Sequence, residues 1–224
     1  MGDQLLELRN AGFSAGKKTI LTDISFHIET GDSTAILGPA GGGKTTALKL
    51  LAGLLVPSQG DAFFEGRALS SMNRQEMLAF RKRSAFVFQD SALWVNQSIY
   101  NTLELPLLTH FPAMSGKERE ARVREAAELV RFSQSLAVRP ADLSAGEQKK
   151  AGFARAIVCN PDILFLDECT ESLDNPAKEI FHGILSEFHT KGGTMVFVSH
   201  DRRFIDLFAQ KVIHIEAGQR SDNR

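Results

Sequence analysis

The chain has 224 residues, 43% of them apolar, so it can bury a core of its own and is too apolar for a disordered protein. Its 26 Lys and Arg nearly balance 27 Asp and Glu, and this excludes a general electrostatic attraction to nucleic acid or to an anionic membrane. The two cysteines, Cys159 and Cys169, match neither a disulfide framework nor a zinc site. No apolar run approaches the roughly 18 residues that span a bilayer, so we expect a cytoplasmic protein that meets a membrane only through a partner.

Short runs that are apolar throughout predict buried strands along the chain. A polar or glycine-rich corner follows each of them, and they cover 34–37, 84–88, 163–166 and 194–199. Continuous rather than alternating apolarity is typical of strands in a parallel sheet whose two faces are both covered by helices. We therefore predict an α/β fold.

Two regions carry helical patterns. Apolar residues at helical spacing predict a helix over 45–55, directly after the first strand. From about 94 to 141 the strand pattern is absent, and Ser115 and Glu118 have the spacing of a capping box that opens a helix. We predict one domain, 1–224, in which a helical subdomain at about 94–141 is inserted into a core formed by 1–90 and 142–224.

The predicted helix after Ser115 has further sequence support. Its expected buried face consists of Val123, Ala126, Ala127 and Val130. Two pairs of opposite charge lie four residues apart, which predicts ion pairs along its exposed side. These pairs are Glu118 with Arg122 and Glu120 with Arg124.

The segment GPAGGGKT, residues 38–45, fits the pattern G-x-x-x-x-G-K-[ST] between a predicted strand and a predicted helix. Glycines in such a loop let backbone N–H groups face phosphate oxygens, and the helix dipole favours the anion. Lys44 is expected to reach the outer phosphates of ATP, and Thr45 to offer its hydroxyl to Mg²⁺. The predicted nucleotide-binding residues here are Gly38, Pro39, Ala40, Gly41, Gly42, Gly43, Lys44, Thr45 and Thr46.

Asp167 and Glu168 follow the buried strand 163–166, at the sheet edge where phosphates bound by a neighbouring strand and helix would also lie. We predict that Asp167 holds Mg²⁺ through water and that Glu168 polarises the attacking water. A solvated pair of loop acids is the alternative, which the phosphate loop disfavours. Cys169 is paired with no base in the sequence pattern, so it is not predicted to be a nucleophile.

Residues 143–148, LSAGEQ, predict another helix start, because Ser144 and Glu147 have capping-box spacing. With the preceding segments in the same order, this one resembles the LSGGEQ signature of the ATP-binding cassette (ABC) ATPases. The resemblance covers essentially the full chain. It implies a P-loop NTPase (RecA-like) fold with a mostly parallel sheet core, an N-terminal antiparallel β part and an inserted α-helical subdomain.

The same resemblance implies an ATPase that needs Mg²⁺ and forms a head-to-tail dimer, expected to be a homodimer. Ser144, Ala145 and Gly146 of one subunit would contact the γ-phosphate of ATP held by the other. Gln89 would contact Mg²⁺ and the attacking water, His200 the γ-phosphate, and Asp174 would lie at the interface. The expected further partners are integral-membrane permease subunits, which would hold the ATPase at the cytoplasmic face of the inner membrane. Without the resemblance, Gln89 is best interpreted as a surface residue and His200 as structural.

Three positions depart from the family pattern. Ala15 stands where an aromatic residue usually stacks on adenine, and Phe13 is expected in the core. Ala145 replaces a glycine, and its methyl group could hinder a close backbone approach or require φ below zero, but it is harmless inside a helical turn. Cys169 replaces a proline, and we expect ATP binding to protect its thiol from alkylation.

The segment 88–107 looks like the corresponding region of Mce/Mla-type lipid-transport ATPases, with Trp94 either at the contact with the permease or as a core anchor. An ATPase of lipoprotein release, macrolide export or cell division is the alternative subtype. Two other classes are a cassette ATPase acting on ribosomes or DNA, and a scaffold that binds ATP and hydrolyses it slowly. We favour an ATPase that energises a membrane transporter, with a lipophilic cargo.

Overall fold

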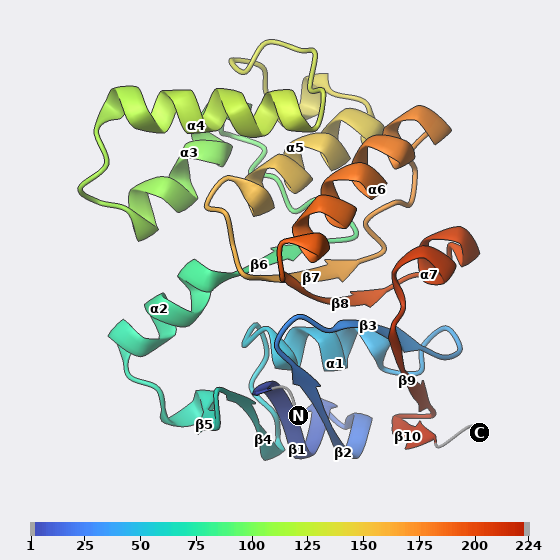
Figure 1. Cartoon of the computed structure of the whole chain (residues 1–224). Helices are drawn as coiled ribbons and strands as arrows, with labels where there is room; N and C mark the ends of the chain where they lie inside the picture. Colours follow the sequence, from blue (N-terminus) through green and yellow to red (C-terminus); the bar gives the residue numbers. More distant parts are fainter. Residues whose placement is uncertain (1–2, 222–224) are drawn as a thin grey trace.

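A six-stranded sheet forms the centre of the computed structural model, which describes residues 3–221 (Figure 1). The strand order is β10-β9-β3-β8-β7-β6, in which only β10 runs antiparallel to its neighbour. The bounds are β3 Ser33–Leu37, β6 Ser84–Val87, β7 Ile163–Asp167, β8 Thr194–Val198, β9 Lys211–Glu216 and β10 Gln219–Ser221. The four predicted strands are β3, β6, β7 and β8, and the prediction of a parallel sheet is confirmed. Residues 1–2 and 222–224 of the predicted domain lie outside the described residues.

Residues of β7 alternate between two hydrophobic cores, one on each face of this sheet. Leu164 and Leu166 belong to the core under the helices α5 (Ala145–Ile157) and α6 (Asn175–Thr190). Ile163 and Phe165 belong to the core around α1 (Lys44–Leu51). Each of these side chains is at most 1% exposed, which explains why the run is apolar at every position.

A second, antiparallel sheet has the order β2-β1-β4-β5 and lies on the far side of α1 (Figure 1, bottom). Its strands are β1 Gln4–Ala15, β2 Lys18–Glu29, β4 Gln59–Phe64 and β5 Arg67–Ala68. The predicted N-terminal antiparallel part is therefore confirmed. The short helix η1 (Leu69–Ser71) and α2 (Arg74–Arg83) connect this sheet to β6, and Asn73 caps α2 with a capping box.

The helix predicted over 45–55 is shorter than expected, because α1 ends at Leu51. Gly53 has φ +62°, a left-handed conformation that turns the chain. The N–H groups of Leu54 and Leu55 then donate back to the carbonyl of Lys49. The apolar residues at 54 and 55 thus belong to the turn after the helix.

Helices fill the chain between β6 and β7 and form the upper layer of Figure 1. They are α3 Ile99–His110, α4 Gly116–Leu129, the short η2 Pro140–Asp142, and α5. The capping box of Ser115 and Glu118 is present, and the predicted buried face of α4 is confirmed. Helices α3 and α4 both pack on α5, so the insertion rests on the helix that begins at the signature. The remaining helix, α7 (Arg202–Phe208), follows β8.

One predicted ion pair of α4 is wrong. Both the side chain and the backbone of Ser115 bond with Glu118, whose carboxylate is thereby used in the cap. Arg122 instead lies 3.4 Å from the carboxylate of Glu125. The predicted pair of Glu120 with Arg124 is confirmed at 2.8 Å. Over residues 3–221, no helix combines the length and the apolar character that crossing a bilayer requires.

Candidate active site

The loop between β3 and α1 is shaped by glycines that no other residue could replace without strain. Gly38 and Gly43 have φ +143° and +102°. A Cβ at Gly38 would lie 2.0 Å from the carbonyl oxygen of Ile215, and one at Gly43 would lie 2.5 Å from Leu21. Gly43 is also the N-cap of α1 and supplies no side-chain acceptor, so the first N–H groups of the helix can bind an anion.

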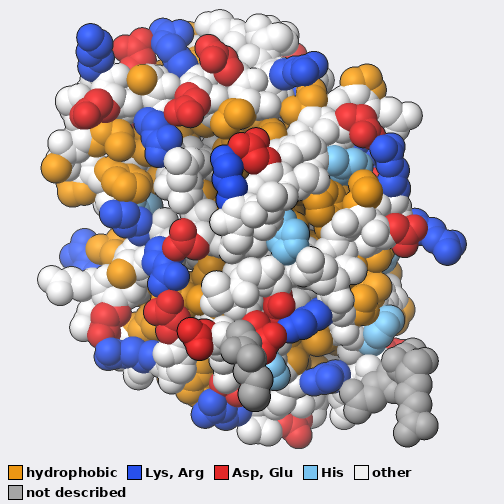
Figure 2. Space-filling view, viewed as in Figure 1, with side chains coloured by type: hydrophobic (Ala, Val, Ile, Leu, Met, Phe, Trp, Pro, Cys, Tyr) orange, Lys and Arg blue, Asp and Glu red, His pale blue; other side chains and the backbone are white. Residues whose placement is uncertain are grey.

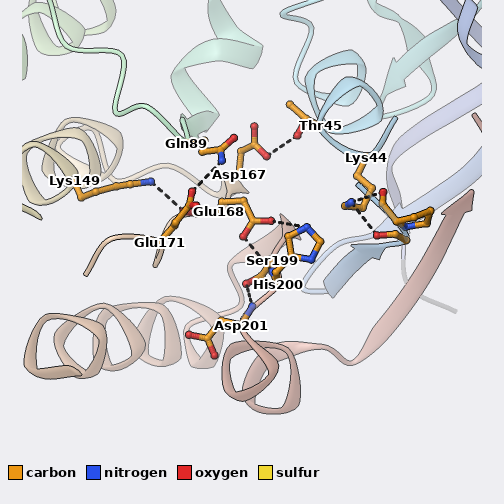
Figure 3. Close-up of polar contacts among 12 residues, drawn as sticks. Lys44, Thr45, Gln89, Lys149, Asp167, Glu168, Glu171, Ser199, His200 and Asp201 are labelled. Carbon is orange, nitrogen blue, oxygen red and sulfur yellow. Dashed lines mark hydrogen bonds and ion pairs between the residues drawn. The ribbon is translucent and has the colours of Figure 1, made fainter. Parts of the chain in front are cut away.

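The Lys44 side chain lies back over this loop. Its ammonium donates to the carbonyl oxygens of Gly38 and Pro39, each at 2.9 Å (Figure 3). The residue is 6% exposed. An ammonium has three N–H donors, and the two used here keep it at the loop with one left for a phosphate oxygen.

Thr45 and Asp167 meet across 122 positions of sequence. The Thr45 hydroxyl donates to Oδ1 of Asp167 at 2.9 Å (Figure 3). Burial at the end of β7 raises the pKa of the Asp167 carboxyl, and the bond from Thr45 opposes this rise. Both residues lie where the sequence predicted a magnesium site.

Glu168 has an uncommon backbone conformation, with φ +47°. Its N–H donates to the carbonyl of Val198, and its carboxylate accepts from the backbone N–H of His200 at 3.1 Å. The imidazole Nε2 of His200 lies 3.5 Å from the same carboxylate (Figure 3). Burial raises the pKa of Glu168, which favours a carboxylate that can accept a proton from water.

Sequence reasoning missed the partner of Gln89. The Gln89 amide donates from Nε2 to the carboxylate of Glu171 at 2.9 Å, and its oxygen has no hydrogen-bond partner among the described residues (Figure 3). Glu171 follows β7 in the same loop as Glu168. An acid at this position is visible in the sequence, but its contact depends on the fold that brings β6 beside β7.

Most of these residues line one open cleft of about 880 Å³, but Gly38, Pro39 and Asp167 are not among its lining residues. It contains Ala40, Gly41, Gly42, Gly43, Lys44, Thr45, Thr46, Gln89, Glu168 and His200 from the predicted set. Sequence reasoning missed Lys18, Thr19 and Ile20 of β2, which also line it. Ala15 is not among the lining residues, and none of the described residues that line the cleft is a Phe, Tyr or Trp on which adenine could stack. Phe13 packs partly buried against the core around α1.

The signature residues lie outside this cleft. Ser144 is the N-cap of α5 and forms the predicted capping box with Glu147. Ala145 is the first residue of the helix and is not among the residues with positive φ, so its methyl group causes no backbone strain. Ser144 and Ala145 are exposed, and Gly146 is half-buried beside the carbonyl of Ser172. A second chain could therefore reach them.

The structure bears against the expectation for Cys169. The side chain is 3% exposed, and burial raises the pKa of its thiol to about 12. A thiol that is both covered and protonated reacts slowly with alkylating reagents. We therefore expect the fold itself, rather than ATP, to protect Cys169.

The oxygen groups at the cleft fit Mg²⁺. The Thr45 hydroxyl, the Asp167 carboxylate and the amide oxygen of Gln89 are hard ligands of the kind that magnesium prefers. In residues 3–221, no group of three or more His, Cys, Asp or Glu could hold a metal ion alone. One carboxylate is enough for Mg²⁺ that arrives with nucleotide phosphates and retains several waters.

Comparison with known proteins decides the family. The family model described as ABC transporter matches residues 21–171, which contain the phosphate loop, the signature helix and the end of β7. The chain is an ATP-binding cassette of the ABC transporter family. The resemblance noted in the sequence, and the fold that it implied, are confirmed.

Curated relatives of the cassette have different stated roles. The nickel import ATP-binding protein NikE of Brucella suis is 35% identical over 210 residues, covering 92% of this chain and 79% of its own. An uncharacterized ABC transporter ATP-binding protein of Methanocaldococcus jannaschii, MJ1508, is 34% identical, covering 96% and 97%. The intermembrane phospholipid transport system ATP-binding protein MlaF of Escherichia coli is 32% identical, covering 88% and 73%.

A solved structure also resembles the cassette over nearly its whole length. This is a dimeric post-hydrolysis state of the ATP-binding cassette MJ0796, bound to ADP and Pi, with a TM-score of 0.89 and 27% identity. It covers 98% of both chains. The cassette described here is an ATP-binding ATPase of this family.

Proposed function

We propose that the cassette binds ATP with Mg²⁺, dimerises head to tail, and uses hydrolysis to energise a membrane transporter. The observation that carries this proposal is the cleft that the phosphate loop shares with Glu168 and His200, together with the hydrogen bond that joins Thr45 in this cleft to the buried Asp167. The dimeric relative bound to ADP and Pi supports the dimer. In such a dimer the exposed Ser144 of one subunit would reach the γ-phosphate of ATP bound by the other.

Hydrolysis on this proposal relies on positioning and charge neutralisation. The phosphate loop and Lys44 hold the phosphates, and Glu168 accepts a proton from the water that attacks the γ-phosphorus. His200 and Gln89 orient the water and the phosphate. Mg²⁺ held near Thr45, Asp167 and Gln89 would neutralise charge on the phosphates.

Replacing Glu168 with Gln tests the catalytic part of this proposal. The amide keeps the shape of the side chain but cannot accept a proton. We expect hydrolysis to fall by roughly 10²–10⁴-fold, while ATP binding and ATP-dependent dimerisation persist. Measurements are steady-state phosphate release, ATP titration and light scattering. Wild-type turnover in the variant would remove Glu168 from the role of base.

An apolar groove beside the insertion is the proposed contact with a permease. It has a volume of about 520 Å³ and is lined partly by Trp94, Val95, Leu105 and Leu108. These side chains are 47%, 66%, 41% and 44% exposed, so the alternative of Trp94 as a core anchor is wrong. The space-filling view shows hydrophobic side chains gathered on the side where α3 lies (Figure 2). An amphipathic helix of a permease is the expected occupant of this apolar groove.

A charge placed in the apolar groove tests this contact. We expect Leu108→Asp to abolish co-purification of permease subunits from detergent-solubilised membranes, because the carboxylate would be buried at the interface. Hydrolysis by the isolated cassette should be unchanged. Leu207→Asp is the matched control, since Leu207 is also exposed, at 55%, but belongs to α7. Equal recovery of the permease with both variants would place the contact elsewhere.

We propose that the transported molecule is lipophilic and that the cassette works at the cytoplasmic face of the inner membrane. The resemblance of 88–107 to lipid-transport ATPases supports this, together with the similarity to MlaF. The similarity to NikE favours nickel as the second candidate. The test is to purify the intact transporter in nanodiscs and measure stimulation of hydrolysis. Stimulation by phospholipid carried on the substrate-binding partner supports the first candidate, and stimulation by Ni²⁺ alone supports the second.

A further inference from the structure

Lys149 is a buried cation for which the proposed mechanism has no role. It lies one helical turn after Ser144 on α5, on the face that packs against the sheet, and is only 5% exposed. Its ammonium donates to the backbone carbonyl of Glu168 at 3.0 Å (Figure 3). Burying an ammonium is unfavourable unless acceptors compensate for its lost hydration, so this contact needs a physical explanation.

The Glu168 backbone is held on both sides by these contacts. The N–H of Glu168 donates to Val198 at the end of β8, and its carbonyl accepts from Lys149. Between them, Glu168 has φ +47°, a conformation that a residue with a Cβ rarely adopts unless its surroundings impose it. That conformation turns the carboxylate away from the strand direction and toward His200.

We propose that Lys149 is a positioning residue for hydrolysis, which holds the Glu168 carbonyl and thereby aims the Glu168 carboxylate at the attacking water. The inference rests on the proposed function, because it takes Glu168 as the base. Lys149 also connects the signature helix to the glutamate of the same subunit. The direction of the Glu168 carboxylate therefore depends on the position of α5.

Lys149→Met tests the proposal, since methionine has a similar length but no N–H. We expect kcat to fall by roughly 10–100-fold, in line with the effect of misplacing a catalytic group by about 1 Å. KM for ATP should change little, because the phosphate loop does not contact Lys149. The thermal unfolding temperature should fall only slightly, because the variant leaves the Glu168 carbonyl without its donor but also removes a buried charge. A structural role alone would instead lower the activity only as far as it lowers the fraction of folded protein.

Lys150→Met is the matched control. Lys150 is the next residue of α5. Its ammonium donates to the carbonyl of Arg131 at 3.4 Å and not to Glu168. This variant should keep the wild-type kcat. Lys149→Gln provides a second variant if Lys149→Met does not fold: its amide is uncharged and one bond shorter, so kcat should also fall.

The double variant Lys149→Met/Glu168→Gln separates positioning from other roles. If Lys149 acts through the Glu168 carboxylate, adding Lys149→Met to Glu168→Gln should not slow single-turnover hydrolysis further. Multiplicative losses, or a kcat of Lys149→Met within about twofold of wild type, would overturn the inference. A wild-type cassette without ATPase activity would instead contradict the proposed function itself.

Discussion

Burial has opposite chemical consequences for Glu168 and Cys169, two adjacent residues at the end of β7. It raises the pKa of the Glu168 carboxyl, which makes its carboxylate a better proton acceptor near neutral pH. It raises the pKa of the Cys169 thiol to about 12, which keeps that thiol protonated and unreactive. The loop therefore presents one reactive group, and Cys169 acts as part of the core.

Alkylation of the folded cassette should leave Cys169 unmodified whether or not ATP is present. The reason is the cover over the thiol together with its raised pKa. Mass spectrometry of peptides after treatment with iodoacetamide at neutral pH checks this, and the same treatment in denaturant is the positive control. Rapid labelling of Cys169 in the native protein would mean that the loop after β7 opens in solution.

His182 should make stability depend on pH. It is buried on α6 beside Phe204 and Phe208, and neither ring nitrogen has a hydrogen-bond partner among the described residues. Burial lowers its pKa, so the unfolded chain takes up a proton at higher pH than the folded one. The contribution of neutral His182 to the free energy of unfolding is therefore complete above the pKa of histidine in the unfolded chain, about 6.5. It is lost as the pH falls below that value.

The measurement is urea unfolding of wild type and His182→Leu at pH 7 and pH 5.5. Wild type should lose more free energy of unfolding than the variant, by at most about 1.4 kcal/mol per pH unit for one proton. Identical losses would show that His182 is protonated in the folded state too. Comparing the two proteins cancels the contribution of the other ionisable groups.

Individual contacts at the site differ in how far the sequence could predict them. The sequence patterns are specific enough to predict the chemical roles of Lys44, Thr45, Asp167 and Glu168. Lys149 lies in an amphipathic helix where a lysine is ordinarily solvated, and only the packing of α5 against the face of the sheet that contains β7 buries it. For the same reason, neither the contact of Gln89 with Glu171 nor the burial of Cys169 could be predicted. Both depend on strands and helices that are distant in sequence.

Helix α5 links several functions at the scale of one element. Its N-cap is Ser144, its next turn carries Lys149 to Glu168, and its other faces support α3 and α4. The sequence predicted its start, because a capping box is a local pattern. Local patterns also predicted the start of α4 but not the end of α1, where the chain turns at Gly53 and leaves Leu54 exposed and Leu55 half-buried outside the helix.

The capping boxes of α5 and α4 allow a matched comparison. Ser144→Ala and Ser115→Ala each remove one cap and should each lower the free energy of unfolding by about 1 kcal/mol. Only Ser144→Ala should also weaken hydrolysis and ATP-dependent dimerisation, because Ser144 is expected to contact ATP of the other subunit. Chemical denaturation and ATPase assays check both. Equal hydrolysis in the two variants would assign Ser144 to capping alone.

At the scale of the whole molecule, two sheets enclose α1, and the central sheet is covered on its other face by α5 and α6 (Figure 1). Of the four strands predicted from apolar runs, β3, β7 and β8 are almost wholly buried, and β6 is half-buried except at Val87. The edge strand β10 and the short β5 lack such runs, since they are partly or fully exposed. The division of the single domain into a core of 1–90 and 142–224 and a helical subdomain at about 94–141 stays a prediction.

Mixing two inactive variants tests the head-to-tail dimer most directly. Lys44→Ala removes the phosphate-loop ammonium, and Ser144→Asp places a negative charge where the γ-phosphate should approach while keeping a good N-cap. In a mixed head-to-tail dimer, one site combines the intact Lys44 of one subunit with the intact Ser144 of the other. We predict that the mixture hydrolyses ATP well above the sum of the two variants alone. Hydrolysis no greater than that sum would contradict a site shared between two chains.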